Sequence, residues 1–225
     1  LEGFTHDGQA LSVNRAGFNG DADALYGATE SLNDGYIPRV EYESRLYLFN
    51  SYGTVYVYLN RVFASVGATL LGFEPFGSSV RDGNLSRISG RWVSAVGGVC
   101  LVLVTWYLGK LLFGGRGALF AALLAALLPM SVQGAHLATV DSLLGLWFGF
   151  ALLFTLRVLK SGQRLDYVLS GICIGLATAT KINGLFLFLP LTLSHLMRQQ
   201  HGYSLESLNQ ALRSPNIYLT GVVAV

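Results

Sequence analysis

The chain has 225 residues, of which 52% are hydrophobic and only 12% are charged. Soluble domains carry about 25% charged residues, so this composition argues against a soluble protein and indicates several membrane-spanning helices. The net charge of +2 does not indicate a polyanionic partner, and no nucleic-acid-binding motif is present. Cys100 and Cys173 both lie within apolar segments, so neither a disulfide nor the redox compartment follows from them, and no metal-ligand spacing is visible.

The leading part of the chain is polar, and residues 1–47 are rich in Gly, Asn and Asp. Within it, residues 24–33 are expected to form a short helix, and the segment SLNDGYIPR at 31–39 favours turns. Residues 48–72 are apolar but contain several tyrosines, which concentrate where lipid meets water. We therefore predict a helix lying at the membrane interface, with a full span as the alternative. Residues 73–91 are expected to form a polar loop.

Five apolar segments follow, each of about one bilayer crossing. They cover residues 92–110, 117–135, 138–157, 165–180 and 182–197, and residues 216–225 begin another. The Gly-rich LFGGRG between the first two predicts a tight turn, and the last two are joined by TKING without room for a loop. The sequence thus predicts an all-α, polytopic helical bundle over residues 92–225, preceded by an extracytoplasmic loop over residues 1–91. We expect the chain to be a fragment, because it starts with Leu1 and stops at Val225 inside an apolar run. A signal peptide is not visible in the polar leading segment.

The positive-inside rule gives the orientation, because Lys and Arg of short loops face the cytoplasm. Alternate turns of the predicted bundle carry these cations: Lys110, Arg116, Arg157, Lys160, Arg164, Arg198 and Arg213. The opposite turns contain His136, Asp141 and Lys181, together with the N-terminal region. These groups are therefore expected to share the outer face of the membrane.

The N-terminal region contains a pair of aspartates, Asp21 and Asp23, in FNGDADALYG. Two neighbouring carboxylates can act as a general base and its orienting partner, because their like charges raise one pKa towards the working pH. The alternative is a solvated turn in which an aspartate caps the helix that follows.

A second group of polar residues borders the apolar segments. Asp141 and His136 belong to GAHLATVD, and their ordinary roles would be a charge at a helix N-terminus and an interfacial ring. Lys181 either extends to the interface, pairs with Asp141, or holds an anionic phosphate. Arg39 and Arg91 are weaker candidates for binding the same phosphate. Polar residues at such positions frequently line a site.

The order and spacing of YLGKLLFG, HLATVD and DYVLSGICIGLATATKINGL resemble the GT-C membrane glycosyltransferases. Within that group the chain is most similar to prokaryotic relatives of the protein O-mannosyltransferases and of the lipid A aminoarabinose transferases. The resemblance covers about residues 87–195 well and residues 18–60 loosely. The family carries an acidic motif, usually Asp-Glu, in its first outer loop. The best match here is Gly20 to Asp23, with Ala22 where Glu is usual; Asp7 is the weaker alternative.

The resemblance implies a multi-pass protein of the cell membrane, expected to be the prokaryotic cytoplasmic membrane. It implies an inverting transferase that moves a hexose or pentose from a polyprenyl phosphate to a hydroxyl of a protein, lipid or glycan. Asp21 would take the acceptor proton, Lys181 and secondarily Arg91 would stabilise the leaving phosphate, and Asp23, His136 and Asp141 would orient the reactants. Neither a metal nor another cofactor is expected.

Two other classes remain open. In a transporter or flippase, His136, Asp141 and Lys181 would line a substrate or proton pathway, but such proteins carry internal repeats and none is convincing here. A non-catalytic membrane scaffold is the third class, and Ala22 favours it.

Overall fold

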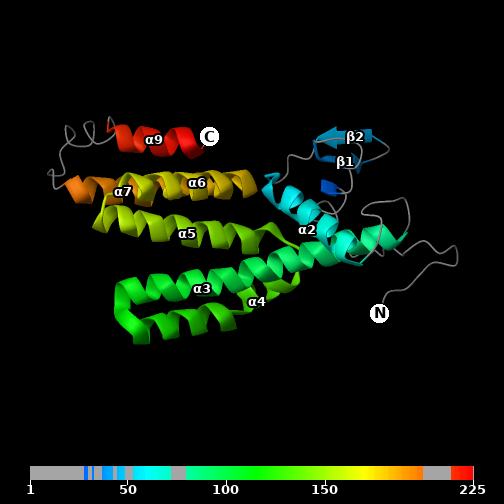
Figure 1. Ribbon diagram of the computed structural model, residues 1–225, viewed down its shortest axis with the longest axis horizontal. Helices are drawn as coiled ribbons and strands as arrows, with labels where there is room; N and C mark the ends of the chain where they lie inside the picture. Colours follow the sequence, from blue (N-terminus) through cyan, green and yellow to red (C-terminus); the bar gives the residue numbers. More distant parts are fainter. Residues whose placement is uncertain are drawn as a thin grey trace.

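The computed structural model is an elongated bundle of helices that run back and forth along one axis (Figure 1). It describes residues 28–29, 32, 37–42, 45–48, 53–71, 80–199 and 214–224. Within these ranges the elements are β1 (Arg39–Tyr42), β2 (Arg45–Leu48), α2 (Val55–Leu71), α3 (Val80–Leu127), α4 (Pro129–His136), α5 (Val140–Lys160), α6 (Arg164–Thr180), the 3₁₀ helix η2 (Ile182–Leu187), α7 (Phe188–Gln199) and α9 (Pro215–Ala224). The predicted helical class is confirmed, with one small hairpin added.

The hairpin is an element that the sequence analysis did not predict. Strands β1 and β2 are antiparallel, with Arg39 opposite Leu48 and Tyr42 opposite Arg45. Its eight residues include valine, tyrosines and leucines, which suit strands, but the segment is short and charged, which hides the pattern. The hairpin lies at the same end of the molecule as α2 (Figure 1).

Helix α2 confirms the helix predicted for this region and packs against the first part of α3. Its Tyr56 is fully buried and donates a hydrogen bond from its hydroxyl to the carbonyl of Gly90 at 2.8 Å. The buried Asn60 accepts from Ser89 Oγ and donates from Nδ2 to Thr29 Oγ1 at 3.2 Å. The prediction of a loop through residue 91 is therefore wrong from Val80 onwards, because this polar packing supports three further turns of helix.

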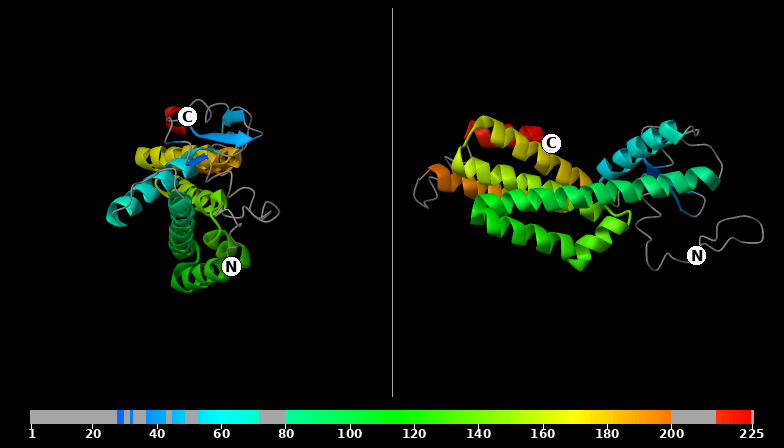
Figure 2. Two further views of the ribbon diagram at one scale, coloured as in Figure 1. Left: turned by 90° about the vertical axis from the view of Figure 1, so that its right-hand side faces the viewer. Right: turned by 60° about the horizontal axis from the view of Figure 1, so that its bottom comes forward.

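Helix α3 folds back on itself at Gly114, so that its two arms lie side by side (Figure 2, right). Gly114 has φ 77° and ψ −171°, a conformation that residues with a Cβ rarely adopt. The tight turn predicted at this point is confirmed. The second predicted segment is interrupted, however: Leu128 has extended backbone because it precedes Pro129, which begins α4.

Helices α5, α6 and α7 form the other half of the bundle. Val158, Tyr167, Ile174, Leu187 and Leu191 are buried in one cluster that joins these helices through η2. The fifth predicted segment, residues 182–197, starts as the 3₁₀ helix η2. Because a 3₁₀ helix rises about 2.0 Å per residue, η2 and α7 together are about 30 Å long, the thickness of one bilayer core. Helix α9 packs on α6, where Cβ atoms at Gly171 and Gly175 would meet α9 backbone at 2.8 and 2.7 Å.

Among the described residues, two helices are long and apolar enough to cross a membrane, Arg87–Leu127 and Val140–Lys160. The first of these contains both arms of α3. Helices α6 and α7 coincide with predicted spans, and their crossing of the bilayer remains a prediction. Helix α3 passes residue 91 without a break, so the predicted division into residues 1–91 and 92–225 has no helix boundary at that point.

Candidate functional site

Two predicted site residues flank the connection between α4 and α5. His136 is the last residue of α4, and Asp141 lies in the first turn of α5, whose N-cap is Thr139. The connection is fixed to α3, because Ser94 Oγ donates to the carbonyl of Thr139 at 3.1 Å. His136 Nδ1 lies 2.8 Å from the carbonyl of Val132. Since a carbonyl only accepts, Nδ1 is the donor in this contact.

Lys181 reaches this connection from the end of α6. It is the C-cap of α6 and the N-cap of η2, with extended backbone (φ −158°, ψ 136°). Its Nζ lies 3.1 Å from Oδ1 of Asp141, and the two side chains are 33% and 63% exposed. The pairing of Lys181 with Asp141 that the sequence left open is therefore present. Asp141 also suits its place, because a carboxylate in a first turn complements the helix dipole.

A cavity of about 970 Å³ lies between the two arms of α3, α4 and the start of α5. Arg91, His136 and Asp141 all line it, so three predicted site residues share one cavity. Most of the remaining wall is apolar, and its larger side chains are Ile88, Trp92, Val99, Leu101, Val102 and Met130. This is the usual design of a small-molecule site, in which apolar walls carry a few polar groups.

The N-terminal part of α2 is attached to the same end of the bundle as Lys181. The backbone N–H of Gly53 donates to the carbonyl of Thr180 at 3.0 Å. The approach needs a glycine, because a Cβ at Gly53 would lie 1.6 Å from the carbonyl oxygen of Ala179. Further along α2, Asn60 holds Thr29. Thr29, which follows the acidic segment in the chain, thus packs on α2. The start of α2 is in turn hydrogen-bonded, through Gly53, to Thr180, the residue before Lys181.

Other predicted residues lie outside what the structure describes. Asp21 and Asp23 precede the first described residue, Ala28, and so does the alternative Asp7. The backbone of Arg39 belongs to β1, but its side chain is outside the described part. The structure therefore brings Arg91, His136 and Asp141 together in the cavity, adds Lys181 through Asp141, and leaves the aspartate pair untested.

Several residues of the candidate site were not predicted from the sequence. Trp92, Ser131 and Ser142 also line the cavity, and Ser94 fixes the α4–α5 connection. The part of the cavity wall that α3 forms could have been found in the sequence, because residues 88, 92, 95, 99 and 102 follow helical spacing and share one face of the helix. That spacing does not reveal which helix lies opposite, since the fold-back at Gly114 decides it.

Comparison with curated proteins and with solved structures gave no match. The family model described as dolichyl-phosphate-mannose-protein mannosyltransferase matches residues 75–225, about two thirds of the chain. This match includes the cavity, the α4–α5 connection and Lys181, and it confirms the resemblance to the GT-C glycosyltransferases. The chain belongs to the dolichyl-phosphate-mannose-protein mannosyltransferase family of membrane glycosyltransferases.

Proposed function

We propose that the protein transfers a sugar from a polyprenyl-phosphate donor to an acceptor hydroxyl on the outer face of the membrane, with inversion of the anomeric centre. The observation that carries this proposal is the cavity lined by Arg91, His136 and Asp141, with Lys181 paired to Asp141.

The donor chemistry fits the lining of the cavity. A polyprenyl phosphate joins a long apolar chain to a charged headgroup, and the cavity joins walls such as Trp92, Val99 and Met130 to the polar Arg91, His136 and Asp141. Apolar contacts favour the prenyl part, while the polar groups determine which end of the donor lies where. This match supports a lipid-linked donor over a free sugar.

The leaving phosphate requires a positive charge. Negative charge builds on the phosphate oxygen as the glycosidic bond breaks, so a cation at that position stabilises the transition state more than the ground state. Lys181 is the first candidate, because its side chain is one-third exposed and its Nζ contacts Asp141, which lines the cavity. Arg91 is the second and Arg39 a weaker third. Asp141 neutralises Lys181 until the phosphate arrives.

The base belongs to the acidic segment. Asp21 takes the acceptor proton while the acceptor oxygen attacks the anomeric carbon, and the bond to the lipid phosphate breaks with its electron pair leaving on the phosphate. One displacement of this kind inverts the centre and needs one essential carboxylate. Asp23 orients Asp21, and His136 and Asp141 orient the sugar. The covalent chain supports this arrangement, because Asp23 is five residues from Ala28 and thus within about 18 Å of it.

The test is Asp21→Asn in the full-length protein, assayed by transfer from a radiolabelled polyprenyl-phosphate sugar. Asp34→Asn is the matched control, because it makes the same change in the same polar segment. General-base catalysis contributes about 10²–10⁴-fold, so Asp21→Asn lowers kcat by roughly that factor and Asp34→Asn leaves it unchanged. Unchanged transfer in Asp21→Asn would remove this residue from its role.

A further inference from the structure

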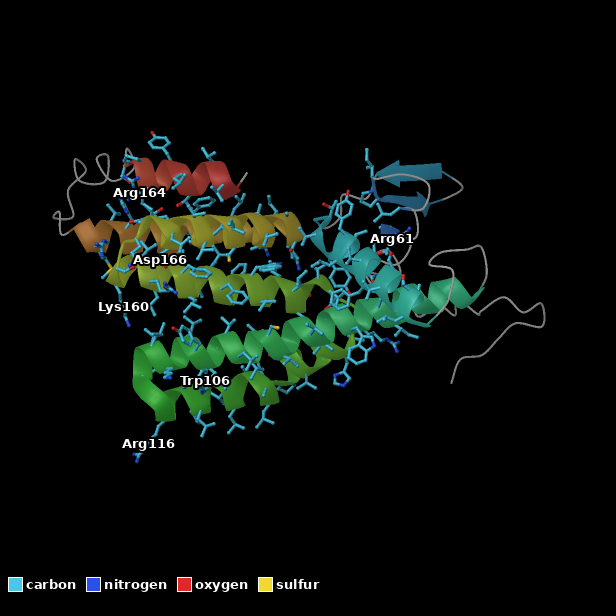
Figure 3. The ribbon with its side chains drawn as sticks, viewed as in Figure 1. Arg61, Trp106, Arg116, Lys160, Arg164 and Asp166 are labelled. Carbon is cyan, nitrogen blue, oxygen red and sulfur yellow. The ribbon has the colours of Figure 1, made fainter. Side chains whose placement is uncertain are left out.

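Three separate segments bring six cations to the end of the bundle opposite α2. They come from the fold-back of α3, the α5–α6 turn and the last turn of α7. We call this set the basic end, and it comprises Lys110, Arg116, Arg157, Lys160, Arg164 and Arg198. Figure 3 shows Arg116, Lys160 and Arg164 spread over this end, with Arg61 at the opposite one.

Specific contacts hold the three segments together. Because α3 breaks at Gly114, the carbonyl of Leu111 accepts a hydrogen bond from Lys160 Nζ at 3.1 Å, which joins the fold-back to the end of α5. Arg198 lies over the α5–α6 turn, since a Cβ at Gly162 would be 1.9 Å from its Nε. The cations therefore form one surface.

Carboxylates do not balance this charge. Among the described residues at this end, Asp166 is the one carboxylate, and it is fully buried. Its Oδ1 lies 2.8 Å from Arg157 Nε, and its Oδ2 accepts a hydrogen bond from Ser161 Oγ at 2.6 Å. In the sequence, the segment between α7 and α9 adds one glutamate and one arginine, Glu206 and Arg213, which cancel. Six cations and the single carboxylate of Asp166 leave the described part of this end with a net positive charge.

An apolar rim borders the basic end. Leu112, Phe113, Leu119 and Phe120 flank the fold-back and are exposed, Phe113 to 75%. Lys110 Nζ lies 5.2 Å from the ring centroid of Trp106, which is itself partly exposed. Cations beside exposed aliphatic and aromatic side chains match a phospholipid, whose phosphate and acyl chains are adjacent.

We propose that the basic end binds the headgroups of anionic phospholipids in the membrane leaflet that it faces, as a lipid site separate from the donor cavity. Arg116 and Arg164 are exposed and contact the headgroups, Lys160 also fixes the fold-back, and the apolar rim contacts the acyl chains. Bound lipid then stabilises the contact between the two halves of the bundle at this end, because it neutralises cations from all three segments.

The full-length protein in nanodiscs of phosphatidylcholine, with or without phosphatidylglycerol, tests this proposal. The enrichment of spin-labelled phosphatidylglycerol next to the protein is measured by electron paramagnetic resonance. Arg116→Gln removes one cation from the basic end, and Arg87→Gln removes one from the same helix at its other end. One cation near an anionic surface changes affinity roughly fivefold, so Arg116→Gln lowers enrichment about fivefold. Arg116→Lys retains the enrichment, and so does Arg87→Gln.

Three results would overturn the proposal. These are no enrichment of phosphatidylglycerol around the unmodified protein, an equal loss in Arg116→Gln and Arg87→Gln, or displacement of the lipid by inorganic phosphate at constant ionic strength. The last would identify a site for free phosphate. Sugar transfer is measured in parallel, because loss of lipid enrichment with normal transfer separates this site from the donor cavity.

Discussion

Replacing Lys181 with methionine distinguishes a phosphate-binding role from a merely structural ion pair. Methionine keeps an unbranched side chain of nearly the same length and removes the charge, so Asp141 loses its partner. The pair is only partly buried, with 33% and 63% of the two side chains exposed. Exposed pairs of this kind contribute about 0.2–1 kcal/mol, so the melting temperature in detergent changes by only a few degrees.

The effect on transfer is expected to be much larger. Removing one group that stabilises developing charge lowers kcat about 10²–10³-fold, or roughly 3–4 kcal/mol in activation free energy. The assay is single-turnover transfer from a polyprenyl-phosphate sugar, measured together with thermal unfolding. Asp141→Asn is the comparison, because it breaks the same pair but leaves the cation in place; its loss of transfer reflects only the orienting role of Asp141 and is expected to be smaller. Equal losses of transfer in Lys181→Met and Asp141→Asn, each explained by lower stability, would refute the phosphate role.

Three other substitutions test the fold and the cavity. Gly53→Ala places a Cβ 1.6 Å from the carbonyl oxygen of Ala179. We expect it to destabilise the protein by about 1–3 kcal/mol in thermal unfolding. Gly115→Ala is the control and has little effect, because a Cβ at Gly115 meets open space. Val99→Trp fills the cavity and raises the donor KM. Leu103→Trp leaves the donor KM unchanged, because Leu103 is exposed on the same helix outside the cavity lining. Equal KM values in the two variants would contradict the assignment of the cavity as the donor site. Asp166→Asn removes the buried negative charge beside Arg157 and lowers stability by about 1–3 kcal/mol. The charge-retaining Asp166→Glu is its comparison, and an unchanged melting temperature in Asp166→Asn would show that the ion pair contributes nothing.

The helical segments followed from the sequence because apolar runs and charged turns alternate regularly. The turn at Gly114 was predicted from its glycines, and the structure places a positive φ at that residue. The interruption at Pro129 was missed although proline is a direct signal, because hydropathy alone runs through it. The helical start at Val80 was missed for a different reason: its support comes from Tyr56 and Asn60, which are distant in sequence.

Some residues of the candidate site could be singled out from the sequence, but their arrangement could not. His136, Asp141 and Lys181 stood out because charged and polar groups in apolar surroundings are costly unless they are used. Their grouping depends on the connection between α4 and α5, which Ser94 holds from another helix. The cavity depends on the fold-back of α3, which brings Val99, Ala126 and, in α4, Met130 to the lining of one cavity. Sequence periodicity gives the face of a helix but not its partner.

The most direct test determines on which side of the membrane the two halves of the proposed site lie, the acidic segment and Lys181. A membrane-impermeant maleimide labels single cysteines in a background without Cys100 and Cys173. The cysteines replace Ala24 next to the acidic segment, Ile182 next to Lys181, and Gly115 in the fold-back. The account predicts that Ala24→Cys and Ile182→Cys react in intact cells, whereas Gly115→Cys reacts only after permeabilisation. Labelling of Ala24→Cys and Ile182→Cys from opposite sides would contradict it.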